Sequence, residues 1–125
     1  HFRAATHPAD AVGWRALAQA LSDIAAMGGE PRFVLVSLAL AGWADRRWLD
    51  GFYRGLLRLA RRTGAVLAGG DLGHADKVYC DMVAGGITLT VNESNRFETF
   101  CYSNPEHRNI TIHCSNCMLR GMWIL

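Results

Sequence analysis

The chain has 125 residues, half of them hydrophobic and 19% charged, which suits one globular domain that can bury a core without disulfides or a structural metal. Its net charge of +2 is small, and Lys and Arg are spread along the chain, so the composition argues against a nucleic-acid partner. No apolar run reaches the roughly 18 residues of a transmembrane helix, and no leader opens the sequence. We therefore expect no membrane partner and a cytoplasmic location.

The first forty residues predict a helix followed by a strand. Asp10 is expected to cap a helix running to about Met27, because apolar residues recur there at helical spacing. Gly28 and Gly29 are expected to end it with a left-handed residue. Residues 33–40 are almost continuously apolar, which predicts a central strand covered on both faces.

A second helix–strand pair follows. Asp45 is a candidate cap for a helix that Gly64 ends, and its expected buried stripe is Leu49, Phe52, Tyr53, Leu56 and Ala60. Residues 65–68 predict a short buried strand that ends in a turn at residues 69–71, and residues 77–90 predict a further strand or hairpin arm. This alternation indicates an α/β layered fold. From Val91 onward the sequence has no clean period, and no element is assigned.

Two carboxylates stand out as candidates for chemistry. Asp23 lies at the edge of the first helix's apolar face, where a carboxylate is costly to bury unless it meets a cation or several donors. Asp71 follows Gly69 and Gly70, whose backbone N–H groups could approach a phosphate while the carboxylate holds a hard cation. The alternatives are an Asp23 bonded to backbone or arginine and an ordinary turn closed by the Asp71 side chain.

Four segments in order carry a resemblance to a known family: residues 22–28 (Ser-Asp-Ile-Ala-Ala-Met-Gly), residues 33–40, residues 48–56 and residues 69–71 (Gly-Gly-Asp). Together they resemble the N-terminal domain of the thiamine-monophosphate kinases, relatives of aminoimidazole ribonucleotide synthetase and selenophosphate synthetase. The resemblance implies an α/β (α+β) domain like that of the synthetase N-terminus, a mixed sheet with helices on one face. It implies a partial ATP- and magnesium-binding domain over residues 1–90 and leaves residues 91–125 as a tail of unknown, not necessarily native, origin.

The same resemblance assigns roles to individual residues. Asp23 and Asp71 would bind Mg²⁺, Gly70, Asp71 and Tyr53 would contact ATP, and His1 would contact thiamine monophosphate. The implied reaction is ATP-dependent phosphorylation of thiamine monophosphate to the diphosphate, in a parent enzyme that is a homodimer. The sequence does not identify catalytic residues. Because the family's further metal ligands belong to a segment of which only His1 and Phe2 are present, we expect a fragment that is inactive alone.

Several alternatives stay open at this stage. Tyr53 also fits a core position with its hydroxyl at the rim, and His1 also fits an exposed chain end. The chain could belong to another ATP-using member of the superfamily, or act as a noncatalytic dimerising or zinc-binding module. Cys114 and Cys117 have the spacing of a zinc knuckle, with Cys101, His107 and His113 nearby in sequence, but a second pair of ligands at a suitable spacing is missing.

Overall fold

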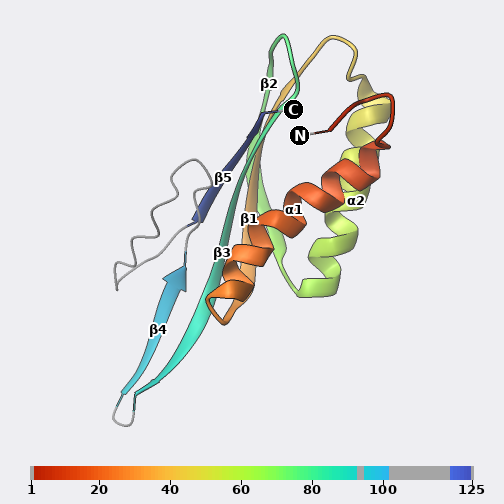
Figure 1. The fold of residues 1–125 in the computed structure, drawn as a ribbon. Helices are drawn as coiled ribbons and strands as arrows, with labels where there is room; N and C mark the ends of the chain where they lie inside the picture. The colour runs from red at the N-terminus through yellow and green to blue at the C-terminus, as the bar shows by residue number, and fades with distance from the viewer. Residues whose placement is uncertain (1, 93–94, 102–118, 125) are drawn as a thin grey trace.

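The computed structural model describes residues 2–92, 95–101 and 119–124, and the side chains of residues 2–87. The order of elements is α1 (Ala9–Ala26), β1 (Gly29–Leu40), α2 (Arg46–Thr63), β2 (Val66–His74), β3 (Tyr79–Asn92), β4 (Asn95–Cys101) and β5 (Leu119–Ile124). Two helices and a sheet form two layers, with both helices on one side of the sheet (Figure 1). This confirms the predicted mixed sheet with helices on one face.

Helix α1 ends as predicted but begins differently. Gly28, which follows the C-cap residue Met27, has a left-handed φ of +67°, which a residue with a side chain rarely adopts. At the start, Pro8 occupies the cap position without a side-chain hydrogen bond, and Asp10 lies inside the first turn. The prediction that Asp10 caps the helix is therefore wrong, although a negative charge in the first turn still favours the helix dipole.

Helix α2 confirms both predicted ends. The Asp45 carboxylate accepts a hydrogen bond of 2.8 Å from the backbone N–H of Trp48, and Gly64 follows the last turn with a φ of +75°. Glycines also let α1 and α2 cross closely. A Cβ at Gly55 would overlap the backbone carbonyl of Asp10, and a Cβ at Gly13 would overlap that of Phe52.

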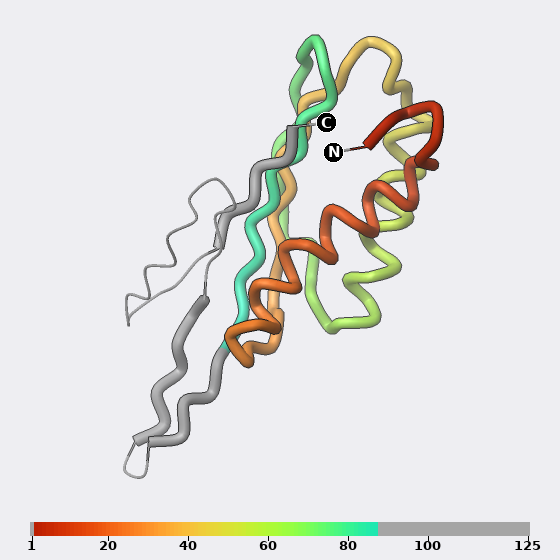
Figure 2. Tube along the Cα trace, in the orientation of Figure 1, coloured from red at the N-terminus to blue at the C-terminus, as the bar shows by residue number. Residues whose placement is uncertain are grey.

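The sheet has the strand order β2-β1-β3-β4, with β5 also pairing with β3. Strands β1 and β2 are parallel and joined through α2, whereas β3 runs antiparallel to β1; Figure 2 follows this path of the chain. In β1, every second residue from Val34 to Leu40 is buried, while Ser37 on the opposite face is exposed. The prediction that both faces of β1 are covered is therefore wrong for the described residues, because both helices pack on the face of Val34.

Strand β2 corrects a second expectation. Residues 69–71 do not form a turn but continue the strand, which extends to His74. The strand is also less buried than predicted, since the side chain of Val66 is 62% exposed. Gly70 lies so close to β1 that a Cβ would overlap the Val36 carbonyl. The glycine thus allows close pairing of two strands in this structure, a role that the sequence pattern does not distinguish from a turn.

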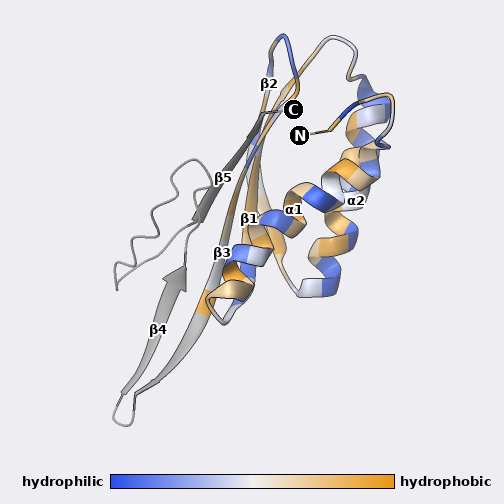
Figure 3. Ribbon diagram, in the orientation of Figure 1, coloured by the Kyte–Doolittle hydropathy of each residue, from blue (hydrophilic) through white to orange (hydrophobic). Residues whose placement is uncertain are grey.

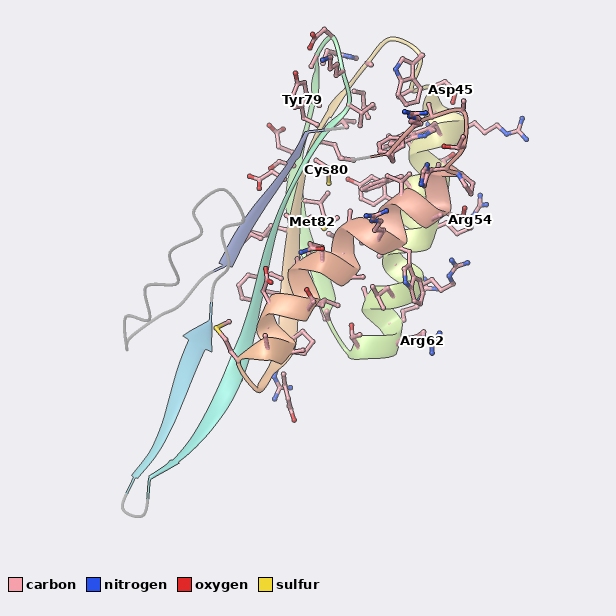
Figure 4. All side chains as sticks on the ribbon, in the orientation of Figure 1. Asp45, Arg54, Arg62, Tyr79, Cys80 and Met82 are labelled. Atoms are coloured by element: carbon pink, nitrogen blue, oxygen red, sulfur yellow. The ribbon has the colours of Figure 1, made fainter. Side chains whose placement is uncertain are left out.

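The core lies between the sheet and the two helices. Its largest fully buried side chains include Phe52, Leu17, Ile24 and Leu56, and Cys80 and Met82 of β3 project toward the helix layer (Figure 4). Hydrophilic residues follow the outward sides of the helices (Figure 3). Strands β4 and β5 lie in the part of the chain where the sequence predicted no element.

Candidate functional site

Asp71 lies on the edge strand of the sheet, on the face away from the helices. Its partner in β1 is Ser37, and partners in adjacent strands project to the same face. The side chain of Asp71 is exposed, and its Oδ1 accepts a 2.8 Å hydrogen bond from the backbone N–H of Leu72. Asp71 makes no ion pair with the described residues, so its second carboxylate oxygen is available to a cation.

Ser37 also aligns with Asp81 of β3, a residue that the sequence analysis did not single out. Asp71, Ser37 and Asp81 therefore form one row across three strands. Strands lie about 4.8 Å apart, so the two aspartates are separated by roughly 10 Å at their backbones. Strand alternation in the sequence could place Asp81 on the face opposite Cys80, but only the pairing register brings it into line with Asp71.

Asp23 lies on the other side of the sheet from Asp71. It belongs to α1, at the edge of the face that packs on the sheet, and its side chain is half-buried. Within the described part of the chain it makes no hydrogen bond or ion pair. The fold therefore does not bring the two predicted metal ligands together within one chain.

Tyr53 lies in the helix layer rather than beside Asp71. Its ring meets the Phe52 ring edge-on, with 5.6 Å between centroids, and it packs against the core. Burial raises the pKa of the Tyr53 hydroxyl, and the nearby Cys80 thiol raises it further. These contacts fit the alternative interpretation of Tyr53 as a residue at the rim of the core.

Cys80 has the most altered acidity among the described side chains. Burial raises the pKa of its thiol from 9.0 to about 12, and the charge of Asp81 adds to this effect. A buried thiol of this kind stays protonated at neutral pH and is a poor nucleophile or metal ligand. Cys80 therefore belongs to the core rather than to a reactive site.

The described residues only partly fit a magnesium site. Mg²⁺ favours oxygen ligands and keeps several waters, so one exposed carboxylate such as Asp71 can hold it together with the oxygens of a phosphate. However, no group of three or more His, Cys, Asp or Glu among the described residues could hold a metal ion. Asp71 and Asp23 are thus two separate carboxylates, and a magnesium site at either one would need other groups to complete it.

Some predicted residues cannot be placed. His1, Cys114 and Cys117 lie outside the described residues, as do His107 and His113, and the side chain of Cys101 is not among those described. The zinc-knuckle alternative therefore stays untested. Neither α1 nor α2 has the length and apolar character needed to cross a membrane, and no other helix occurs among the described residues.

Comparison with known proteins assigns the first 90 residues to a family. The family model "AIR synthase related protein, N-terminal domain" matches residues 1–90. A second model, "Probable glycosyl hydrolase, catalytic domain", matches residues 62–119, which is less than half of the chain and overlaps the first match.

Curated relatives and solved structures agree with the first match. The thiamine-monophosphate kinase of Synechococcus elongatus is 47% identical over 88 residues, which cover 69% of this chain and 26% of that protein. The crystal structure of thiamine-monophosphate kinase from Stenotrophomonas maltophilia has a TM-score of 0.63 and 32% identity, over 77% of this chain and 28% of that one. The structure of AaThiL complexed with AMPPCP and TMP has a TM-score of 0.62 and 26% identity, over 77% of this chain and 28% of that one. The chain spans about a quarter of the length of the curated relatives that it matches.

Proposed function

The chain belongs to the AIR synthase related family through its residues 1–90, and from this premise we propose that it is part of a kinase that uses ATP to phosphorylate thiamine monophosphate to the diphosphate. The observation that carries the proposal is the 47% identity with a thiamine-monophosphate kinase over 88 residues. Support for the ligands comes from a similar structure that holds AMPPCP and TMP. We place the reaction in the cytoplasm.

Phosphoryl transfer requires that the phosphates be positioned and their charge neutralised, with little covalent chemistry from the protein. In this proposal, Asp71 holds a magnesium ion at the phosphates, and the exposed position of its carboxylate supports that role. Gly70, beside Asp71, contacts the nucleotide, and His1 contacts thiamine monophosphate. Tyr53 lies in the helix layer on the other side of the sheet, so its contact with the same nucleotide would come from a second copy of the chain. When bound, the ion would supply positive charge to the phosphates.

Asp23 is proposed as the second magnesium ligand, but it lies across the sheet from Asp71. A shared ion would require the two carboxylates to come from different copies of the chain. Because Asp23 lies in the helix layer and Asp71 on the uncovered face of the sheet, such a homodimer would bring the helix layer of one copy against the uncovered sheet face of the other, where Val66 is 62% exposed.

Binding of magnesium and ATP to the 125-residue chain tests these roles. We expect titration calorimetry to show magnesium-dependent ATP binding that Asp71→Asn weakens by about ten-fold or more, since one lost charge-assisted ligand costs on the order of 1.5–3 kcal/mol. Asp76→Asn is the matched control, because Asp76 is also exposed and lies two residues beyond the end of β2. Equal affinities for the two variants would contradict a metal role for Asp71.

Mixing variants tests whether the site is shared between two copies. If Asp23 and Asp71 act from different copies, a mixture of Asp23→Asn and Asp71→Asn chains contains dimers with one intact site, and part of the ATP binding returns. If both act within one chain, the mixture binds no better than either variant. We further expect no thiamine diphosphate from the 125-residue chain alone; measurable turnover would show that it needs no further ligands.

A further inference from the structure

Two arginines of α2 gather over one tryptophan of α1. The guanidinium carbon of Arg58 lies 5.0 Å from the centroid of the Trp14 ring, and that of Arg62 lies 5.6 Å from it. Both distances are within the range of a cation–π contact. Arg58 also faces the Asp10 carboxylate at 3.7 Å, whereas Arg62 has no carboxylate partner among the described residues.

These two residues belong to a longer row of positive charge. The arginine stripe consists of Arg54, Arg58, Arg61 and Arg62, all exposed on the side of α2 that faces away from the sheet. Figure 4 shows Arg54 and Arg62 on this outward side. Spacings of three and four residues bring the side chains next to one another on the helix, and like charges at that spacing destabilise a helix.

The contacts of the stripe offset this repulsion only in part. Trp14 holds two of the guanidinium groups, and Arg61 and Arg62 in the last turn favour the helix dipole. The Arg58–Asp10 pair is solvent-exposed, so it contributes little to stability, and at 3.7 Å it is too long for a direct hydrogen bond. Of these four cations, only Arg58 contacts a carboxylate of the described residues, and an added anion would lower their mutual repulsion.

We propose that the arginine stripe and Trp14 form a docking site for an acidic segment of another protein, whose carboxylates bind Arg58 and Arg62. The planar guanidinium group matches a carboxylate with two parallel hydrogen bonds, and stacking on Trp14 holds both groups in place before the partner arrives. Asp10 already shows that a carboxylate can approach the stripe. Arg54 and Arg62 are eight residues apart, or about 12 Å along a helix, which faces roughly four residues of an extended peptide.

A nucleic acid fits this surface less well. Single-stranded nucleic acids bind through bases stacked on aromatic rings, but the Trp14 ring is already covered by two guanidinium groups. The small net charge of +2 also gives little long-range attraction for a phosphate backbone.

A labelled peptide with four consecutive glutamates tests the proposal by fluorescence anisotropy on the full chain. We expect binding that weakens with added salt and that the double variant Arg58→Gln, Arg62→Gln weakens by about ten-fold or more. The control double variant Arg3→Gln, Arg32→Gln removes the same charge from exposed arginines outside α2 and is expected to change the affinity by less than about two-fold. Trp14→Leu should weaken binding by roughly three-fold, because the arginines lose the ring that orients them.

Three results would overturn the proposal. Equal losses in the two double variants would show attraction by net charge alone. Tighter binding of a hexauridylate than of the peptide, lost in Arg58→Gln, Arg62→Gln, would assign the stripe to nucleic acid. A lower Tm of that variant with unchanged peptide affinity would assign the arginines to helix packing.

Discussion

Alanine substitutions at Gly69 and Gly70 form a matched pair that tests how closely β2 packs against β1 beside Asp71. Both glycines have nearly the same backbone conformation, with positive φ values of +159° and +158° that residues with a side chain rarely adopt, so the backbone cost of adding a side chain is common to both. Their surroundings differ. A Cβ at Gly69 would meet only the side chain of Leu35, at an ordinary 3.7 Å, whereas a Cβ at Gly70 would overlap the Val36 carbonyl.

The expected difference between Gly69→Ala and Gly70→Ala follows from that contact. A backbone carbonyl within a sheet cannot rotate away as a flexible side chain can, so β2 must separate from β1 near Asp71. Overpacking of this kind costs about 1–3 kcal/mol, and a weakened ladder hydrogen bond adds about 1 kcal/mol. We expect Gly70→Ala to be less stable than Gly69→Ala by about 2–4 kcal/mol.

Urea unfolding followed by circular dichroism measures this difference in the free energy of unfolding directly. In thermal unfolding, the Tm values of the two variants should differ by roughly 3–6 °C for each kcal/mol. If β2 moves, Gly70→Ala should also lose magnesium-dependent ATP binding, while Gly69→Ala keeps it. Equal stabilities of the two variants would refute the close approach of Gly70 to Val36, and with it the account of this residue as a strand-pairing glycine.

Three further predictions concern the fold. Asp45→Ala should cost about 1 kcal/mol in urea unfolding because it removes the cap of α2, whereas Asp50→Ala, which breaks only an exposed pair with Arg46, should cost less than about 0.5 kcal/mol. Phe52→Ala should cost about 3–5 kcal/mol, since its ring is fully buried. Raising the pH from 9 toward 12 should lower the free energy of unfolding, because the Cys80 thiol ionises only in the unfolded chain over that range; the decline in Cys80→Ala should be shallower, and an equal slope would contradict the burial of the thiol.

Features set by local chemistry were predictable from the sequence. The cap at Asp45 and the left-handed glycine at Gly64 depend on residues within one turn of the helix end. The buried stripe of α2 could be predicted from the helical spacing of its apolar residues alone, and Phe52, Leu56 and Ala60 are indeed buried. By contrast, Asp10 fits the start of α1 either as a cap or as a first-turn charge, and local sequence does not decide between them.

Features set by strand pairing were not predictable. Residues 69–71 have the composition of a turn, but glycine also permits two backbones to approach closely, and only the position of Val36 distinguishes the two uses. For the same reason the row formed by Asp71, Ser37 and Asp81 could not be found, because it depends on the register of three strands. The chain's apolar run at residues 33–40 did not reveal that only one face of β1 meets the helices.

The position of Asp71 in a strand rather than a turn changes what a phosphate can contact there. In a turn, successive backbone N–H groups can converge on one anion. In an edge strand paired on one side, only alternate N–H groups point outward, so β2 offers spaced donors along its free edge and a carboxylate on the uncovered face. A nucleotide bound here would therefore depend on the metal ion at Asp71 more than on a cradle of backbone amides. One carboxylate leaves most of the ion's ligand positions to phosphate oxygens and water, and any further protein ligand would come from outside the described residues or from a second chain.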